Sequence, residues 1–104
     1  EVSPDLQRRY GRLYGLTVSG TSMVDALIDD GDVVIVKPAQ EAANGEMVVA
    51  WLKTEEEATL KKFYLEGGGR VRLQPANSQM ASLHCPADNV EIRGKVVAVI
   101  RKFN

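Results

Sequence analysis

Several residue types are scarce in this chain of 104 residues, and each scarcity excludes a class of protein or site. Cys85 is the only cysteine, so no disulfide can form within the chain, and we expect a reducing, cytoplasmic compartment. His84 is the only histidine, and a zinc site needs several Cys or His ligands, so we expect no metal. No motif requires a cofactor either. No apolar run approaches the roughly 18 residues that span a bilayer, which argues against a membrane partner.

A large excess of charge is also lacking. The 13 basic and 14 acidic side chains nearly cancel, whereas a nucleic-acid-binding surface carries a basic stripe. If a larger protein containing this chain binds DNA, we expect other residues to do so. The first ten residues are polar and begin with Glu1, so we expect no signal peptide and interpret the chain as a fragment of a longer protein.

What the sequence does contain is a series of short β-prone segments separated by turn signals. The expected strands are Leu16–Ser19, Val33–Val36, Met47–Leu52, Ala58–Tyr64, Arg70–Leu73, Val90–Ile92 and Val96–Ile100. Met23–Ile28 is expected to form a short helix or helical turn, and a further turn is expected near Asp5–Tyr10. The prediction is therefore one mostly β domain over residues 1–104, with about seven strands.

Ser22 is the first candidate for a chemical role. It follows a β-prone segment and Gly20, and it precedes the expected helical turn. A serine hydroxyl is a weak nucleophile until a base takes its proton, and a desolvated lysine amine can be that base. Backbone N–H groups at such a turn can also stabilise an oxyanion. A structural interpretation stays open, because Ser22 and Asp25 match the Ser-x-x-Asp pattern that caps a helical turn.

Lys61 and Lys62 are adjacent on an expected strand, so their side chains point to opposite faces, with Lys61 on the face of Thr59. One of the two is expected to point inward. To act as a base near neutral pH, a lysine needs a pKa far below its usual 10.4, which destabilises the charged form by about 4 kcal/mol. Burial among apolar groups can supply that. The alternative is that both ammonium groups reach solvent from a strand edge.

Six consecutive blocks, considered together, decide between these interpretations. They are Val18–Met23, Asp30–Asp32, Asn44–Ala50, Ala58–Phe63, Leu73–Ser78 and Gly94–Arg101. In their order and spacing they resemble the C-terminal domain of LexA-type SOS repressors, in the superfamily of LexA, UmuD and phage repressors. The resemblance covers nearly all of the chain from about Leu16 onward, and it implies a LexA/signal-peptidase-like β fold.

The resemblance implies roles for individual residues. Ser22 stands at the nucleophile of the family, and Lys61 stands at its general base, with Lys62 as the outward neighbour. Thr59 matches a threonine whose hydroxyl orients the lysine amine. The backbone amides of Thr21 and Ser22 are the implied oxyanion donors.

The resemblance also implies a reaction and partners. In the family, a loop of the same chain enters the site and one peptide bond is hydrolysed, stimulated by the activated RecA filament on single-stranded DNA. It further implies a homodimer formed through the C-terminal strand, and contact with operator DNA only through an N-terminal domain. The Ala-Gly cleavage bond of the family is absent ahead of Ser22. We therefore expect a catalytic and dimerisation domain without its DNA-binding domain or cleavage loop.

Other interpretations remain. A UmuD-like protein or a phage repressor shares the Ser and Lys blocks, although the Leu-x-Pro-x-Asn-Ser block and the Val-Ile-Arg ending favour LexA. A non-catalytic dimerisation module would use Ser22 as a helix cap and keep Lys61 at the surface. A membrane-anchored signal peptidase shares the chemistry, but no membrane segment supports it.

The remaining polar and aromatic residues are expected to be structural. His84 and Cys85 are predicted to lie in a loop, pointing to opposite sides of the chain. The acidic residues Glu55–Glu57 and Asp30–Asp32 are typical of solvated turns, not of a metal site. Trp51, Phe63 and Tyr64 are assigned to the core and its rim.

Overall fold

The chain forms one seven-stranded antiparallel sheet, seen in a computed structural model that describes residues 11–101. The strands are β1 (Tyr14–Thr17), β2 (Val33–Pro38), β3 (Met47–Leu52), β4 (Glu57–Glu66), β5 (Arg70–Gln74), β6 (Leu83–Pro86) and β7 (Val90–Ile100). The only helical elements among the described residues are two 3-10 turns, η1 (Val24–Ala26) and η2 (Ala87–Asn89). The predicted mostly β fold is confirmed, while the turn expected near Asp5–Tyr10 lies outside the described residues.

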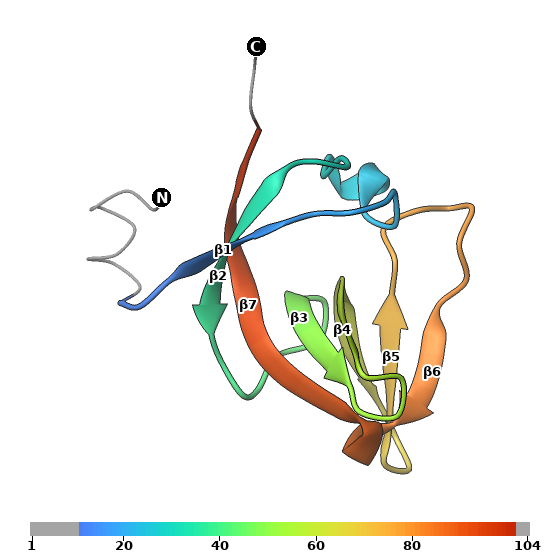
Figure 1. Cartoon of the computed structure of the whole chain (residues 1–104). Helices are drawn as coiled ribbons and strands as arrows, with labels where there is room; N and C mark the ends of the chain where they lie inside the picture. Colours follow the sequence, from blue (N-terminus) through green and yellow to red (C-terminus); the bar gives the residue numbers. More distant parts are fainter. Residues whose placement is uncertain (1–10, 102–104) are drawn as a thin grey trace.

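The order of strands in the sheet is β1-β2-β7-β3-β4-β5-β6. The long strand β7 joins two groups of strands: residues 94–100 pair with β2, and residues 90–95 pair with β3. Figure 1 shows β7 as a curved strand that rises past β3 toward β1 and β2. The sheet is therefore bent around β7, and the segment between β1 and β2 that carries Ser22 packs against β3 and contacts Lys61 of β4.

Strand β7 corrects one expectation. Val90–Ile92 and Val96–Ile100 were predicted as separate strands because Gly94 lies between them, yet they form one strand. The register shifts on both sides of β7, between Ile35 and Val36 of β2 and between Val49 and Ala50 of β3. Such irregularities bend a strand without ending it. Gly94 does not break β7; it lies where Val36 and Lys37 of β2 approach the β7 backbone closely.

Strand β6 corrects another. His84 and Cys85 were predicted to lie in a loop, but both belong to β6, which pairs with β5. The predicted alternation does hold, since Cys85 is buried and the His84 side chain is about half exposed. A four-residue edge strand that ends at a proline has too few residues for a periodic signal.

The apolar core consists of two clusters. One joins strands β3 to β6 and includes Val48, Leu73 and Cys85. The other contains Met23 and Ile28, from the segment after β1, packed with residues of β2 and β3. Both side chains are only 1% exposed. Burial of each contributes about 1.5–3 kcal/mol, so the segment that carries Ser22 is anchored on both sides of η1.

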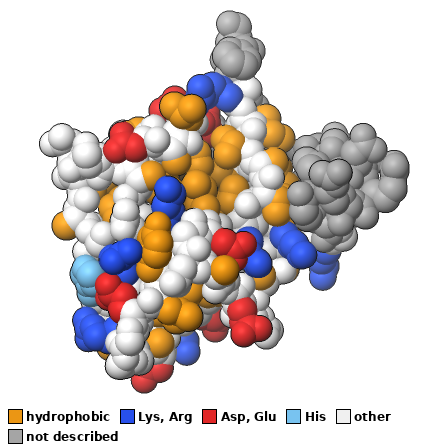
Figure 2. Space-filling model, turned by 180° about the vertical axis from the view of Figure 1, so that it is seen from behind, with side chains coloured by type: hydrophobic (Ala, Val, Ile, Leu, Met, Phe, Trp, Pro, Cys, Tyr) orange, Lys and Arg blue, Asp and Glu red, His pale blue; other side chains and the backbone are white. Residues whose placement is uncertain are grey.

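The surface has no single dominant charge. Figure 2 shows hydrophobic side chains gathered in the upper part of one face, with acidic and basic side chains distributed around them. Over the described residues, no helix is long and apolar enough to cross a membrane.

Candidate functional site

The Ser22 segment leaves the sheet after β1 and returns at β2. Two backbone hydrogen bonds close its base: the Val18 amide donates to the Asp32 carbonyl and the Gly31 amide to the Val18 carbonyl, each at 2.8 Å. Gly20 adopts φ 88°, a left-handed conformation that favours glycine. Its amide donates to Asp30 Oδ1 at 2.8 Å. The chain is thereby turned sharply two residues before Ser22.

The predicted helical turn is present but shorter than expected, because η1 covers only Val24–Ala26. Met23, not Ser22, occupies the N-cap position, and no side chain caps the turn. The interpretation of Ser22 as a helix cap is therefore wrong. Asp25 has a different task, since its Oδ2 accepts a hydrogen bond from the Ser78 amide at 2.8 Å.

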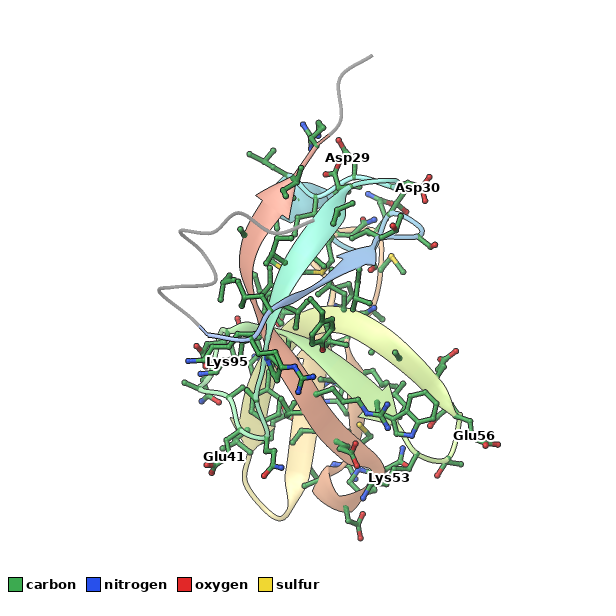
Figure 3. The ribbon with its side chains drawn as sticks, turned by 60° about the vertical axis from the view of Figure 1, so that its left-hand side comes forward. Asp29, Asp30, Glu41, Lys53, Glu56 and Lys95 are labelled. Atoms are coloured by element: carbon green, nitrogen blue, oxygen red, sulfur yellow. The ribbon has the colours of Figure 1, made fainter. Side chains whose placement is uncertain are left out.

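Arg101, at the end of β7, secures the other side of this segment. Its guanidinium donates to both carboxylate oxygens of buried Asp32, at 3.2 and 3.1 Å, and to the Leu27 carbonyl at 2.9 Å. It also pairs with Asp29 at 3.0 Å. The Arg101 hydrogen bond lowers the pKa of the Asp32 carboxyl, as does the bond from the Asp29 amide. Figure 3 shows Asp29 and Asp30 at the end of the molecule where β7 ends.

Sequence reasoning assigned Asp30 and Asp32 only to turn chemistry and missed Arg101. A buried aspartate needs a cationic partner, but nothing in the sequence pairs position 32 with position 101.

Ser22, Thr59 and Lys61 are brought together by β4 and the segment after β1. Lys61 Nζ donates to Thr59 Oγ1 at 2.5 Å and to Ser22 Oγ at 3.4 Å. Burial lowers the pKa of the Lys61 ammonium, and the Glu57 carboxylate partly opposes this by raising it. A lysine whose charged form is disfavoured, within hydrogen-bond distance of a serine hydroxyl, can accept the proton of that hydroxyl.

These three residues line a cavity of about 320 Å³. The remaining lining residues are mostly apolar or small; they are Leu16, Thr17, Val18, Ser19, Val34, Val49, Ala58 and Leu60. An apolar cavity with a few convergent polar groups is typical of a binding or active site. Lys62 lies on the other side of β4, in a separate groove that also contains Asp25 and Asn77.

Thr59→Val should lower the pKa of Lys61 further. The Thr59 hydroxyl accepts a hydrogen bond from the ammonium and so favours the charged form, while valine keeps the shape and removes the acceptor. A hydrogen bond to a charged group favours that charged form, so we expect the pKa to fall when the acceptor is removed. NMR titration of the lysine side chain measures it. Thr59→Ser, which retains the hydroxyl, should titrate like the wild type; an equal fall in both variants would contradict the role of this bond.

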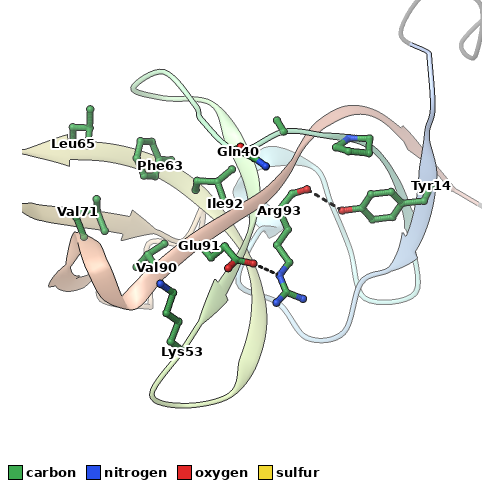
Figure 4. A pocket seen from close by; sticks show the side chains of 13 residues that line it. Tyr14, Gln40, Lys53, Phe63, Leu65, Val71, Val90, Glu91, Ile92 and Arg93 are labelled. Carbon is green, nitrogen blue, oxygen red and sulfur yellow. Dashed lines mark hydrogen bonds and ion pairs between the residues drawn. The ribbon is translucent and has the colours of Figure 1, made fainter.

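A larger cavity, of about 780 Å³, lies away from Ser22. Figure 4 shows it between Tyr14, Phe63, Ile92 and Arg93, with Arg93 bound to Glu91 and its carbonyl facing the Tyr14 hydroxyl. Its lining includes no serine, threonine, cysteine or histidine. Size alone therefore does not locate the chemistry, and the smaller cavity is the better candidate site. Within residues 11–101, no group of His, Cys, Asp and Glu is placed to hold a metal ion.

A family model described as "Peptidase S24-like" matches residues 1–97, which is most of the chain. This chain belongs to the peptidase S24-like family. The family consists of serine peptidases, so the predicted relation to LexA-type domains and to serine peptidases is confirmed at that level.

Curated relatives of this S24-like chain agree. A LexA repressor from Herpetosiphon aurantiacus is 54% identical over 95 residues, covering 91% of this chain and 44% of the relative. A LexA repressor from Roseiflexus sp. is 46% identical over 105 residues, covering 99% of this chain and 48% of the relative. A third, from Pelotomaculum thermopropionicum, is 48% identical over 93 residues, covering 89% of this chain and 43% of the relative. The chain thus spans less than half the length of these relatives.

Proposed function

We propose that this chain is the peptidase domain of a LexA-type repressor, with Ser22 as nucleophile and Lys61 as general base. The observation that carries the proposal is the contact of 3.4 Å between Lys61 Nζ and Ser22 Oγ, formed by a lysine whose pKa is lowered by burial. The match to an S24-like peptidase family supports the same chemistry.

The reaction has two stages. Neutral Lys61 takes the Ser22 proton while Oγ attacks a peptide carbonyl, and the backbone amides of Thr21 and Ser22 stabilise the resulting oxyanion. The lysine ammonium then gives its proton to the departing amine, and the carbonyl carbon stays bonded to Ser22 Oγ. Water, deprotonated by Lys61, hydrolyses that ester and releases the carboxylate. Thr59 keeps the amine oriented through both stages.

The substrate is an extended peptide segment. Strand β1 is at the edge of the sheet, and Leu16, Thr17, Val18 and Ser19 line the cavity. An edge strand presents unpaired backbone groups that can pair with an added strand. In the whole protein this segment is the cleavage loop of the same chain, so the reaction is self-cleavage, stimulated by the activated RecA filament on single-stranded DNA.

Dimerisation is assigned to the C-terminal part of β7. Residues 96–100 pair with β2 on one side, whereas β3 pairs only with residues 90–95 on the other. Val99 and Ile100 are each 42% exposed. A half-paired strand with exposed apolar residues favours pairing with a second copy, and operator DNA is left to an N-terminal domain. Sedimentation of the chain measures the dimer.

Two alternatives are weaker. A UmuD-like protein or phage repressor has the same dyad, but the relatives described above are LexA repressors. A non-catalytic dimerisation module would use Ser22 as a helix cap and keep Lys61 at the surface, but Met23 occupies the N-cap position of η1 and burial lowers the pKa of Lys61.

Cleavage in trans tests the proposal. The substrate is a full-length LexA-type repressor whose own serine is replaced by alanine, because this sequence has no Ala-Gly bond ahead of Ser22. The wild-type chain is expected to cleave it at a single bond, faster at alkaline than at neutral pH. Ser22→Ala removes the nucleophile and should leave no cleavage above background, with an unchanged thermal unfolding curve. Cleavage by the Ser22→Ala variant at the wild-type rate would refute the proposal.

A further inference from the structure

The loop that follows β5 is bound to the Ser22 segment by backbone and side-chain contacts. The Asp25 amide donates to the Ala76 carbonyl at 2.6 Å, and the Ser78 amide donates to Asp25 Oδ2 at 2.8 Å. The Ala76 amide lies 3.4 Å from the sulfur of buried Met23. These contacts join positions more than 50 residues apart in the sequence. The loop therefore helps to hold the Ser22 segment in place.

Asn77 contacts the residue that precedes Ser22. Its Nδ2 donates to the Thr21 carbonyl at 2.8 Å, and its Oδ1 accepts from the Gln79 amide at 2.9 Å. Because an amide nitrogen only donates and an amide oxygen only accepts, a single orientation of the side chain satisfies both partners. The turn at Gln79 therefore holds the Asn77 nitrogen toward Thr21.

The peptide between Thr21 and Ser22 transmits this contact. None of the described peptide bonds is cis, and in a planar trans peptide the C=O and N–H groups point in opposite directions. With the Thr21 carbonyl held toward Asn77, the Ser22 N–H points away from it. Asn77 lines the groove on the Lys62 side of β4, whereas Ser22 lines the cavity of Lys61. The Ser22 N–H is thus directed to the cavity side.

We propose that Asn77 is a positioning residue, which holds the Thr21–Ser22 peptide so that the Ser22 N–H faces the oxyanion formed during peptide cleavage. The inference rests on the proposed function of Ser22 and extends it to a residue that touches neither substrate nor base. A donor that is already oriented before the reaction stabilises the transition state without reorganisation. Without Asn77 the Thr21 carbonyl keeps only the longer hydrogen bond from the Val24 amide, at 3.3 Å, so the Ser22 N–H is present but held less firmly.

The test compares two variants with a matched control, using the cleavage reaction in trans described above. Asn77→Asp keeps the acceptor for the Gln79 amide and places a second oxygen against the Thr21 carbonyl. Asn77→Ala removes both bonds without adding charge. Asn44→Asp is the control, because among residues 11–101 Asn44 bonds only through its Oδ1, which accepts from the Leu65 amide at 2.7 Å, and a carboxylate retains that role.

We expect kcat to fall about 10- to 100-fold in both Asn77 variants, which is less than the loss of about 10²- to 10³-fold that follows removal of a whole oxyanion donor. KM should stay within about twofold, because the donor acts mainly in the transition state. The pH midpoint for Asn77→Ala should equal that of the wild type, since the contacts of Lys61 are unchanged. Asn44→Asp should keep wild-type kcat.

Thermal unfolding separates positioning from folding. If Asn77 had only a structural role, activity would fall in proportion to the unfolded fraction of each variant, and this result would overturn the inference. A kcat within about twofold of wild type in both Asn77 variants would also overturn it. In either case the wild-type chain still cleaves and the proposed function stands. If the wild-type chain shows no Ser22-dependent cleavage, both proposals fall.

Discussion

Lys61→Met is expected to reduce cleavage in trans by about 10²- to 10⁴-fold, the contribution typical of a general base. Methionine keeps an unbranched side chain of similar length, so it fills the same space beside Ser22 and Thr59 without an amine. In the wild type, the rate should rise with pH as the ammonium loses its proton. Because burial lowers the pKa of Lys61, this rise should level off below the usual lysine value of about 10.4. In Lys61→Met the residual rate should not follow this titration.

The neighbouring residue supplies the control. Lys62 is on the opposite side of β4, in the groove with Asp25 and Asn77. Lys62→Met removes the same charge from the same strand, and it should keep both the rate and the pH profile of the wild type. The measurement is the initial rate of substrate cleavage from neutral to alkaline pH. A Lys61→Met variant that retains the wild-type pH profile would show that another group is the base.

Gly94→Ala is expected to destabilise the fold by about 1–3 kcal/mol, the usual cost of overpacking a core. Gly94 pairs with Pro38 of β2 on one side and with Val49 of β3 on the other. A Cβ atom built there overlaps the Val36 side chain and lies 2.9 Å from the Lys37 carbonyl and 3.0 Å from the Tyr14 hydroxyl. The Val36 side chain and the Lys37 carbonyl are both part of β2, so neither can move away from the added carbon without distorting that strand.

Gly67→Ala is the matched control for Gly94→Ala. Gly67 lies in the turn between β4 and β5, no atom lies within 4 Å of an added Cβ, and its φ is not in the left-handed region. Its effect should stay within about 0.5 kcal/mol, as for most surface substitutions. Urea unfolding of both variants gives the two free energies of unfolding. Equal midpoints for the two would show that β2 and β7 separate to accept the extra carbon.

Much of the fold could be predicted because the local residue pattern indicates most of the strands. β-Branched runs bounded by turn residues form strands where expected: Val33–Val36 lies within β2, and Met47–Leu52 is β3. The failures have a common cause, since they depend on partners distant in sequence. The local pattern at Gly94 indicates the end of a strand. Strand β7 nevertheless continues through Gly94, because β2 and β3 pair with this residue on both sides. His84 and Cys85 form a strand only because β5 pairs with them.

For the candidate site too, some features could be predicted from the sequence and others depend on contacts between distant residues. Residue types at family spacing predicted that Ser22, Thr59 and Lys61 belong to one site, and the structure places the three side chains together. Their distances, and the burial that lowers the pKa of Lys61, depend on how β4 lies against the segment after β1. Sequence alone also left Ser22 open to a capping role, which the position of Met23 excludes.

By itself, the sequence determined the mostly β class, the peptidase family and the residue types that carry the chemistry, because these depend on local pattern and on short motifs. Only the tertiary structure decided which groups hold the Ser22 segment in place, since Asn77 and Arg101 reach it from loops and strands more than 50 residues away. Such contacts follow from chain packing, which no local pattern encodes. For this protein, the sequence predicts the reacting groups, and the packing determines how these groups lie relative to one another.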